Sequence, residues 1–581
     1  MFKAERLSSF LQHAYCSKAF RICQALKFAY NREMTFSQFF NIQTKTIAFA
    51  AGLLVLSSLV SRALGIVRNG LLSWRFGAGE TTDIYLAAFR IPDFIYGILI
   101  MGGISAVFLP MFSEHFHTSR EEGWKFTSNV LNVLFLLLLV LSALAFLFAP
   151  FLVEFITPGF TTEQQETTAS LTRLMLLSPL LLGVSSVFSG MLHYFGKFLA
   201  YSLAPILYNV GIIAGIVFLV PLFGIWGLGL GVVTGALLHS AVQVPAVLHS
   251  GFKWSPLFDW RDQAMKKMFL LALPRTIAAA SLHVNLVVLT ALASLIATGS
   301  ITIFNYANDV QYFPIGLIGV SFAMAAFPSL SRSFAKKNIK DFQEAFATTF
   351  RQIFFFVMPV AILLFLLRAQ SVRLVYGAGD KFTWDDTRLT AAALGIFAFG
   401  VLFQALIPFL ARAFFATKDT KAPTVISLFS VAFNIVLAVF LIRTLAVPGA
   451  LGDVLVALLK LEGIEDIRVL ALPLALVISG MAQAILLGIF LAKYVREILQ
   501  KDLYLSLAKT AVASVALGIV TYGILRLYGG VFFLTTYEEV LGQLLLASMG
   551  GILAFAACAF LVKSPEMLYF WKALKGKLYG R

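Results

Sequence analysis

The sequence predicts an all-α polytopic membrane protein with about 14 transmembrane helices, arranged as two parallel-repeat six-helix lobes plus two C-terminal helices. Three observations predict this fold: the composition, the number of long apolar runs, and an internal repeat. Of the 581 residues, 59% are hydrophobic and only 13% are charged, and the mean hydropathy is +0.87. A soluble domain cannot bury so much apolar surface, so the composition indicates a chain that crosses a membrane many times.

The apolar runs are long enough to span a bilayer, which requires about 18 to 25 helical residues. The predicted spans are residues 46–72, 80–111, 126–156, 167–194, 199–221, 225–249, 267–298, 302–331, 342–368, 388–415, 422–445, 469–495, 504–528 and 540–562. Basic residues gather in alternate connections and at both ends of the chain, with 369–387 and 446–468 as the main exceptions. Because cytoplasmic loops collect Lys and Arg, this pattern predicts an even number of spans with both termini cytoplasmic. The same rule accounts for the net charge of +16 without a nucleic-acid partner.

The N-terminal segment, residues 1–45, is basic and only weakly apolar. It lacks the apolar core and cleavage site of a signal peptide. Two interpretations stay open: an amphipathic helix on the membrane surface, or a true start at Met34. The rest of the chain is predicted to divide into a first lobe at 46–250, a second lobe at 251–497, a C-terminal helix pair at 498–563 and a basic cytoplasmic tail at 564–581.

The internal repeat relates the first six spans to the next six. "VFLPMFSEHF" matches "AAFPSLSRSF", "VEFITPGF" matches "VRLVYGAGDKF", and "GMLHYFGKFLAYSLAP" matches "ARAFFATKDTKAPT". The offsets are 218 residues from Pro110 to Pro328, 219 from Val153 to Val372, and 218 from Pro205 to Pro423. A constant offset across six spans predicts two lobes of the same orientation, which is typical of transporters that work by alternating access.

The first predicted span contains two arginines, Arg62 and Arg68. Six helical residues place them about 9 Å apart along the axis and about 120° apart around it. Both can face one cleft if the helix bends at Gly65 or Gly70. Either they line a polar cleft and bind an anion, or Arg68 extends to the interface and Arg62 pairs with an acid of the second span.

Other charges within predicted spans are further candidates for substrate binding, because a charge inside the bilayer usually faces a cavity or a partner. They are Asp83, Arg90, Asp93, Arg275 and Asp309. Three have structural alternatives: Asp83 as a charge near a helix N-terminus, Arg275 as a cytoplasmic basic residue, and Asp309 as the partner of an arginine in the other lobe.

Several classes of protein are not supported by the sequence. The cysteines at 16, 23 and 558 are too scattered for a metal site, and His193, His239 and His283 lack a second ligand at helical spacing. No H-E-x-x-H motif, Walker A loop or G-x-S-x-G elbow is present. We therefore expect no metal, no cofactor and no enzymatic activity.

A family resemblance rests on motifs spread along the chain. "SRALGIVRNGLLSWRFGAGETTDIYLAAFRIPDFIYGILIMGGISAVFLPMFSEHF" resembles the start of MurJ (MviN) proteins, lipid II flippases of the multidrug/oligosaccharidyl-lipid/polysaccharide exporter superfamily. "LPRTIAAASLHVNLVV", "ITIFNYANDVQYFPIGLIGVSFAMAAFPSLSRSF" and "RAFFATKDTKAP" are similar to the same family. The resemblance covers roughly residues 48–562.

The resemblance implies a bacterial inner-membrane flippase for lipid II, the undecaprenyl-diphosphate-linked precursor of peptidoglycan. It implies that Arg62 and Arg68 meet the diphosphate, that Asp83 is the acid of the family's "TD" element, and that the last two spans form a groove for the polyprenyl tail. The implied partners are the glycolipid, membrane lipids and cell-wall synthesis enzymes. Two alternatives stay open: a flippase for another polyprenyl-diphosphate glycan of the O-antigen type, and a non-transporting cell-wall scaffold.

The chain departs from the family at charged positions. The departures are Asn69 for an acid, Tyr96 and Gly97 for an arginine, Met101 for an acid, Asp309 for an arginine, and Tyr312 for a glutamate. Two of the positive charges that the family would use for the diphosphate are therefore missing. Arg90 or Arg275 could supply them instead.

Overall fold

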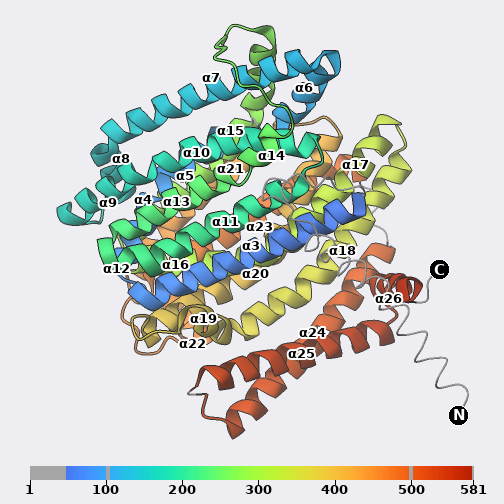
Figure 1. Cartoon of the computed structure of the whole chain (residues 1–581). Coiled ribbons are helices and arrows are strands. Elements are labelled where there is room, and N and C mark those ends of the chain that lie inside the picture. The colour runs from blue at the N-terminus through green and yellow to red at the C-terminus, as the bar shows by residue number, and fades with distance from the viewer. Residues whose placement is uncertain (1–46, 100–104, 496–500, 535, 579–581) are drawn as a thin grey trace, which may run out of the picture.

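The computed structural model describes residues 47–99, 105–495, 501–534 and 536–578, and every long regular element within these ranges is a helix (Figure 1). Residues 1–45, with the possible start at Met34, lie outside the described part, as does Met101. The surface-helix interpretation of this N-terminal segment therefore stays a prediction.

The first lobe, as the name is used here, consists of the helices from α3 to α14. They are α3 (Ile47–Phe76), α4 (Glu80–Ala88), α5 (Arg90–Tyr96), α6 (Ser105–Thr118), α7 (Arg120–Leu147), α8 (Ala149–Ile156), α9 (Thr162–Met175), α10 (Leu177–Tyr194), α11 (Phe198–Ala214), the π-helix η2 (Gly215–Leu219), α12 (Val220–Phe223), α13 (Trp226–Ala241) and α14 (Val244–Leu248).

The second lobe consists of the helices from α15 to α23. They are α15 (Gln263–Ser294), α16 (Ser300–Pro314), the π-helix η3 (Ile315–Val320), α17 (Ser321–Ala335), α18 (Ile339–Leu366), α19 (Arg368–Tyr376), α20 (Trp384–Ala416), α21 (Lys421–Leu445), α22 (Ala450–Leu459), the 3₁₀ turn η4 (Arg468–Leu470) and α23 (Ala471–Val495). Three helices follow: α24 (Lys501–Val531), α25 (Tyr537–Leu561) and α26 (Pro565–Leu578).

Twelve helices in the described ranges are long and apolar enough to cross a membrane, and they correspond to twelve of the predicted spans. The other two, 80–111 and 267–298, differ in form. The first is divided among α4, α5 and α6, and the second coincides with α15, whose apolar part is Ala280–Ser294. The all-helical, multi-pass class is therefore confirmed, and the number fourteen stays a prediction.

Proline stands at three of the places where the long spans change geometry, whereas Pro205, Pro359 and Pro408 lie within continuous α-helices. Pro150 lies in the first turn of α8, where the predicted third span breaks after α7. Pro314 ends α16 before the π-helix η3, and Pro221 follows the π-helix η2. A proline removes a backbone donor and crowds the preceding turn, and a local π-turn is one way for a membrane helix to accommodate it.

The predicted repeat appears as matching structure in the two lobes. Long α7 is followed by short α8, and long α18 by short α19; Val153 and Val372 lie at equivalent, fully buried places in the short helices. The next helix begins in both lobes with a capping box, at Thr161 for α9 and at Thr383 for α20. The repeated sequence motifs therefore lie in helices whose order and N-terminal caps also match between the two lobes.

The hydrophobic clusters lie mainly within one lobe or the other, with contacts across. One cluster joins α7, α10 and neighbouring helices of the first lobe and takes in Met265 and Met268 of α15. Two others join α16, α18, α20, α21 and α23 of the second lobe, and one of these includes Ala87 of α4. The helices α24 and α25 pack against each other and against α18, through a small cluster that includes Phe355 and Phe555. Figure 1 shows this pair at one edge of the molecule, outside the two repeated lobes.

Candidate functional site

Arg62 lies in the middle of α3 and faces the second lobe. A Cβ at Gly316, in η3, would lie 2.7 Å from both terminal nitrogens of the Arg62 guanidinium. Glycine leaves room for the charged group in this position, and a larger residue would make the guanidinium shift. Arg62 is half-buried, and no carboxylate among the described residues lies within 4 Å of it.

Arg68 faces the first lobe and is held by two amides. Its Nε donates to Oδ1 of Asn69 at 3.0 Å, and its Nη1 donates to Oδ1 of Asn209 at 3.4 Å. Asn69 in turn donates to Oδ2 of Asp309, in α16, at 2.7 Å. Among the described residues no arginine lies within 4 Å of Asp309, but the charges of Arg68 and Arg90 in the first lobe both act on its carboxylate. The pairing of Asp309 with an arginine of the other lobe stays a prediction.

The helix α3 is continuous from Ile47 to Phe76, with no break at Gly65 or Gly70, and the bend at these glycines stays a prediction. At Gly70 the absence of a side chain allows close packing against the second lobe. A Cβ at Gly70 would lie 2.6 Å from the carbonyl oxygen of Val375, in α19. The two arginines therefore point to different lobes, as their separation of about 120° on a regular helix requires.

Arg68 lines a first-lobe pocket of about 310 Å³. The pocket also receives Asp93, Tyr208, Asn209 and His239. The structure thus brings Arg68 and Asp93 together at one cavity, and it places Arg62 at the neighbouring interface with η3.

Asp83 binds the beginning of a helix in the other lobe. Its buried carboxylate accepts hydrogen bonds from the backbone N–H of Gly299 at 2.6 Å and from the N–H and hydroxyl of Thr302 at 2.9 and 2.5 Å. A carboxylate at a helix N-terminus satisfies free N–H groups and complements the helix dipole. Asp83 lies in the first turn of its own helix α4, and its carboxylate makes its hydrogen bonds to the beginning of α16.

Arg90 also connects the lobes. Its Nε donates to the hydroxyl of Thr290 at 2.8 Å, and its Nη2 donates to Oδ1 of Asn305 at 2.5 Å. The Ser73 hydroxyl donates to the carbonyl of Tyr376 at 2.9 Å at the same end of the molecule. These hydrogen bonds join the two lobes at the end where α3 ends and α16 begins, which is the closed end of the protein.

Asp93 pairs with a residue that the sequence analysis did not select. Its Oδ2 lies 3.5 Å from Nδ1 of His283, in α15. The imidazole occupies the space beside Gly97, where any Cβ would overlap the ring. The missing side chain at Gly97 was the available signal, but the partner lies in the other lobe and cannot be read from local sequence.

Arg275 belongs to α15, but its side chain lies outside the described residues. Its assignment to substrate or to the cytoplasmic surface therefore stays a prediction. Nearer the start of α15, Lys267 lies 3.5 Å from Glu114 of α6, an exposed contact between the lobes.

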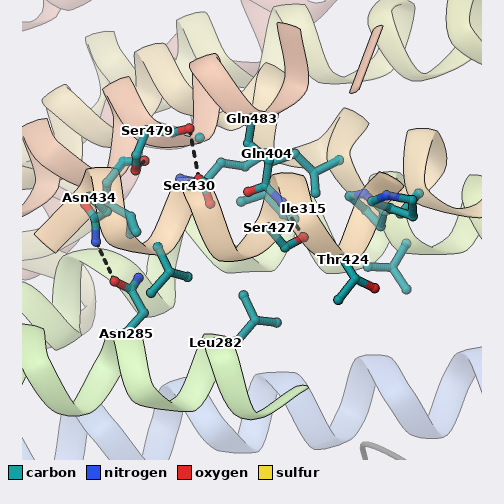
Figure 2. A pocket seen from close by; sticks show the side chains of 18 of the residues that line it. Leu282, Asn285, Ile315, Gln404, Thr424, Ser427, Ser430, Asn434, Ser479 and Gln483 are labelled. Atoms are coloured by element: carbon teal, nitrogen blue, oxygen red, sulfur yellow. Dashed lines mark hydrogen bonds between the residues drawn. The ribbon is translucent and has the colours of Figure 1, made fainter. Parts of the chain in front are cut away.

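A second-lobe pocket of about 410 Å³ lies among α15, α16, η3, α20, α21 and α23 (Figure 2). It is lined by amides, hydroxyls and apolar groups, including Asn285, Gln404 and Asn434. The sequence analysis did not identify it, although polar residues recur at helical spacing along α21.

Comparison with known proteins identifies the family. The family model described as "Lipid II flippase MurJ" matches residues 72–541. The chain belongs to the MurJ family. A probable lipid II flippase MurJ of Rhizobium tropici is 30% identical over 402 residues, covering 68% of this chain and 75% of the relative. The corresponding protein of Haemophilus influenzae is 30% identical over 430 residues, covering 70% and 84%.

Solved structures agree on the fold. A lipid II flippase MurJ in an inward closed conformation matches with a TM-score of 0.68 and 22% identity, over 88% of this chain and 98% of that one. An inward-facing multidrug resistance MATE family transporter of the MOP superfamily matches with a TM-score of 0.59 and 15% identity, over 76% and 95%. The chain is therefore a multi-pass membrane protein of a transporter family. The matched part begins at residue 72, so it includes Asp83 and Asp309 but neither Arg62 nor Arg68.

Proposed function

We propose that this member of the MurJ family moves lipid II, the undecaprenyl-diphosphate-linked peptidoglycan precursor, from the inner to the outer leaflet of the bacterial inner membrane by alternating access. One observation supports the proposal most directly. Arg62 and Arg68 lie within a membrane-spanning helix, and among the described residues neither has a carboxylate within 4 Å. A permanent cation without an ion-pair partner in the membrane is costly, and an anionic ligand would remove that cost.

The chemistry of arginine suits a diphosphate. The planar guanidinium donates pairs of hydrogen bonds to phosphate oxygens and keeps its charge at every physiological pH. Arg62 faces η3 of the second lobe, and Arg68 faces the first-lobe pocket. A diphosphate between them would therefore be in contact with both lobes. In this proposal Asp93, Arg275 and Asp309 belong to the same binding region, and Asp83 and Arg90 act by holding the lobes together.

Alternating access requires that the closed end can open. The polar contacts that hold it are Asp83 to the start of α16, Arg90 to Thr290 and Asn305, and Ser73 to α19. Apolar packing of Ala87 against the second-lobe core accompanies them. Hydrogen bonds of this kind can be exchanged for water when the lobes separate. The proposed cycle opens this end when the opposite end closes around the substrate.

The proposal includes an organisation of the chain. The lobes would extend over 46–250 and 251–497, with both termini cytoplasmic, and the segment 498–563 would hold the polyprenyl tail. Exposed apolar side chains along α24 and α25, such as Ile519, Leu527 and Leu553, are suited to a hydrocarbon chain. Cell-wall synthesis enzymes are the proposed protein partners.

Genetic replacement tests this function. A bacterium depleted of its essential lipid II flippase is supplied with this protein, and growth is scored beside membrane expression. We expect rescue by the wild type, loss of rescue by Arg62→Ala and Arg68→Ala, and rescue by Arg75→Ala, a control at the end of the same helix. An expressed wild type that fails to rescue would contradict the lipid II substrate. Rescue by both cavity variants would contradict the role of the arginines.

A further inference from the structure

The second-lobe pocket has a chemistry that differs from that of the arginine region. Its polar lining includes Asn285, Gln404, Ser427, Ser430, Asn434 and Gln483. Within the described part of the chain, no charged side chain lines it. The pocket therefore offers no counter-charge to an ion, but it offers amides and hydroxyls to a neutral polar molecule.

The helix α21 is arranged to present polar groups to this pocket. Thr424, Ser427 and Asn434 recur at intervals of three and seven residues and line the cavity, which places them on one face of the helix. The opposite face is apolar, with Val425 64% and Val436 67% exposed. Polar side chains in a membrane helix are costly unless they find hydrogen-bond partners. Each of the three polar side chains already has one partner in the protein: Thr424 donates to the carbonyl of Thr420, Ser427 accepts from Gln483, and Asn434 donates to Asn285. The case for a ligand therefore rests on the pocket atoms that remain without a partner.

Two buried polar atoms in the pocket have no hydrogen-bond partner in the described structure. They are the amide nitrogen Nε2 of Gln404, a donor, and the amide oxygen Oδ1 of Asn434, an acceptor. Asn434 is only 1% exposed, and its Nδ2 already donates to Oδ1 of Asn285 at 2.7 Å, as Figure 2 shows. A neutral ligand that carries both an acceptor and a donor would satisfy both atoms.

The pocket adjoins the arginine region. Arg62 lies against Gly316, the residue that follows the lining residue Ile315 in η3. Leu282 and Tyr312 line the pocket and are 59% and 52% exposed, so they mark its open side. A ligand whose phosphate is bound by Arg62 would therefore have its next chemical group near this opening.

We propose that the second-lobe pocket binds the uncharged, amide-bearing sugar that follows the diphosphate of the substrate. The proposal rests on the proposed function, because Arg62 sets the position of the diphosphate. A volume of about 410 Å³ is sufficient for a single sugar ring with a small substituent. Sugar hydroxyls and amides both donate and accept hydrogen bonds, as the free atoms of Gln404 and Asn434 require.

Binding of three ligands to the purified full-length protein tests this assignment. Lipid II carries the diphosphate, the sugars and a peptide, and undecaprenyl diphosphate carries the diphosphate alone. Undecaprenyl diphosphate linked to one N-acetylated sugar carries no peptide, so it should respond to each variant as lipid II does, and a loss of affinity for lipid II alone would contradict the sugar assignment. We expect Gln404→Leu to weaken lipid II binding about tenfold, which corresponds to about 1.4 kcal/mol, and to change undecaprenyl diphosphate binding less than about twofold. Gln165→Leu, the same change at a glutamine of α9 outside the pocket, should leave all affinities unchanged.

The two proposals fail differently in this assay. Arg62→Ala should weaken the binding of all three ligands. An unchanged affinity for undecaprenyl diphosphate would contradict the binding of the diphosphate by Arg62, and it would not by itself contradict the sugar pocket. An unchanged lipid II affinity in Gln404→Leu, or an equal loss for lipid II and undecaprenyl diphosphate, would overturn the sugar pocket.

A second measurement does not depend on removing a hydrogen bond. Ser427→Cys, in a protein whose native cysteines are replaced by alanine, places one thiol on the pocket wall. Lipid II should slow its reaction with a maleimide at least fivefold, and undecaprenyl diphosphate should not. Equal labelling rates with and without lipid II would refute the assignment.

Discussion

Replacing Asp83 by asparagine tests how strongly the closed end is held. Asparagine keeps the shape of the side chain, so no cavity forms, but one carboxylate oxygen becomes an NH₂ group. That group faces either the N–H of Gly299 or the N–H of Thr302, both of which now donate to Asp83. One backbone donor therefore loses its acceptor, and the start of α16 loses a complementary charge.

The size of the effect follows from these contacts. A hydrogen bond to a charged group contributes about 1.5–3 kcal/mol, and a buried donor left without a partner costs about 1–3 kcal/mol. We expect about 3 kcal/mol of destabilisation of the closed end, or about a 100-fold shift between the closed and open arrangements of the lobes.

Thiol accessibility measures this shift. Ser300, at the start of α16, is 2% exposed, so Ser300→Cys in a background without other cysteines reports opening of the closed end. Labelling by a membrane-impermeant maleimide should be about 100 times faster with Asp83→Asn. Glu80→Gln, which removes an exposed acid from the same helix, is the matched control and should not change the rate. Unchanged labelling in Asp83→Asn, or an equal increase in the control, would refute the reasoning.

Three further predictions concern packing and charge. Gly97→Ala places a methyl group where the ring of His283 lies, so overpacking of about 1–3 kcal/mol should lower the midpoint of thermal unfolding. Adding His283→Ala should restore the midpoint, and a double variant that stays destabilised would contradict this contact. Gly231→Leu should destabilise the protein because a Cβ there lies 2.8 Å from the backbone of the facing helix, whereas Gly523→Leu, with nothing within 4 Å, should be tolerated in the same melt. Burial alone would raise the pKa of Asp466, but the hydrogen bonds and charge of Arg468 lower this pKa overall. The contribution of Asp466 to stability is therefore present above about pH 4 and is lost as the pH falls through the folded-state pKa. Melts from pH 6 to pH 3 should show a smaller loss for Asp466→Asn than for the wild type, and identical profiles would count against the prediction.

The site residues show the limit of inference from one sequence. Arg62 and Arg68 were recognisable because a charge in an apolar run is unusual wherever it stands. The role of Asp83 was not recognisable, because its partners Gly299 and Thr302 lie more than 200 residues away in the chain. The role of the glycines in α3 has a related limit, because whether a glycine bends a helix or lets a neighbour approach depends on what packs against it.

The second-lobe pocket shows the same limit of inference from the sequence. The polar positions of α21 can be read from their spacing, but a polar helix face is compatible with a cavity, a second polar helix or bound water. Only the positions of Asn285 and Gln404 on other helices leave an enclosed space with a free donor and a free acceptor.

The sequence by itself determined that this protein is helical, crosses a membrane many times and contains an internal repeat. These properties follow from hydrophobicity, proline positions and repetition, which are local or periodic along the chain. The tertiary structure alone decided that α16 begins on the carboxylate of Asp83, that His283 fills the space beside Gly97, and that a neutral pocket adjoins Arg62. Contacts between the lobes depend on which helix faces meet, and that is set by the packing of the whole chain rather than by any segment of it.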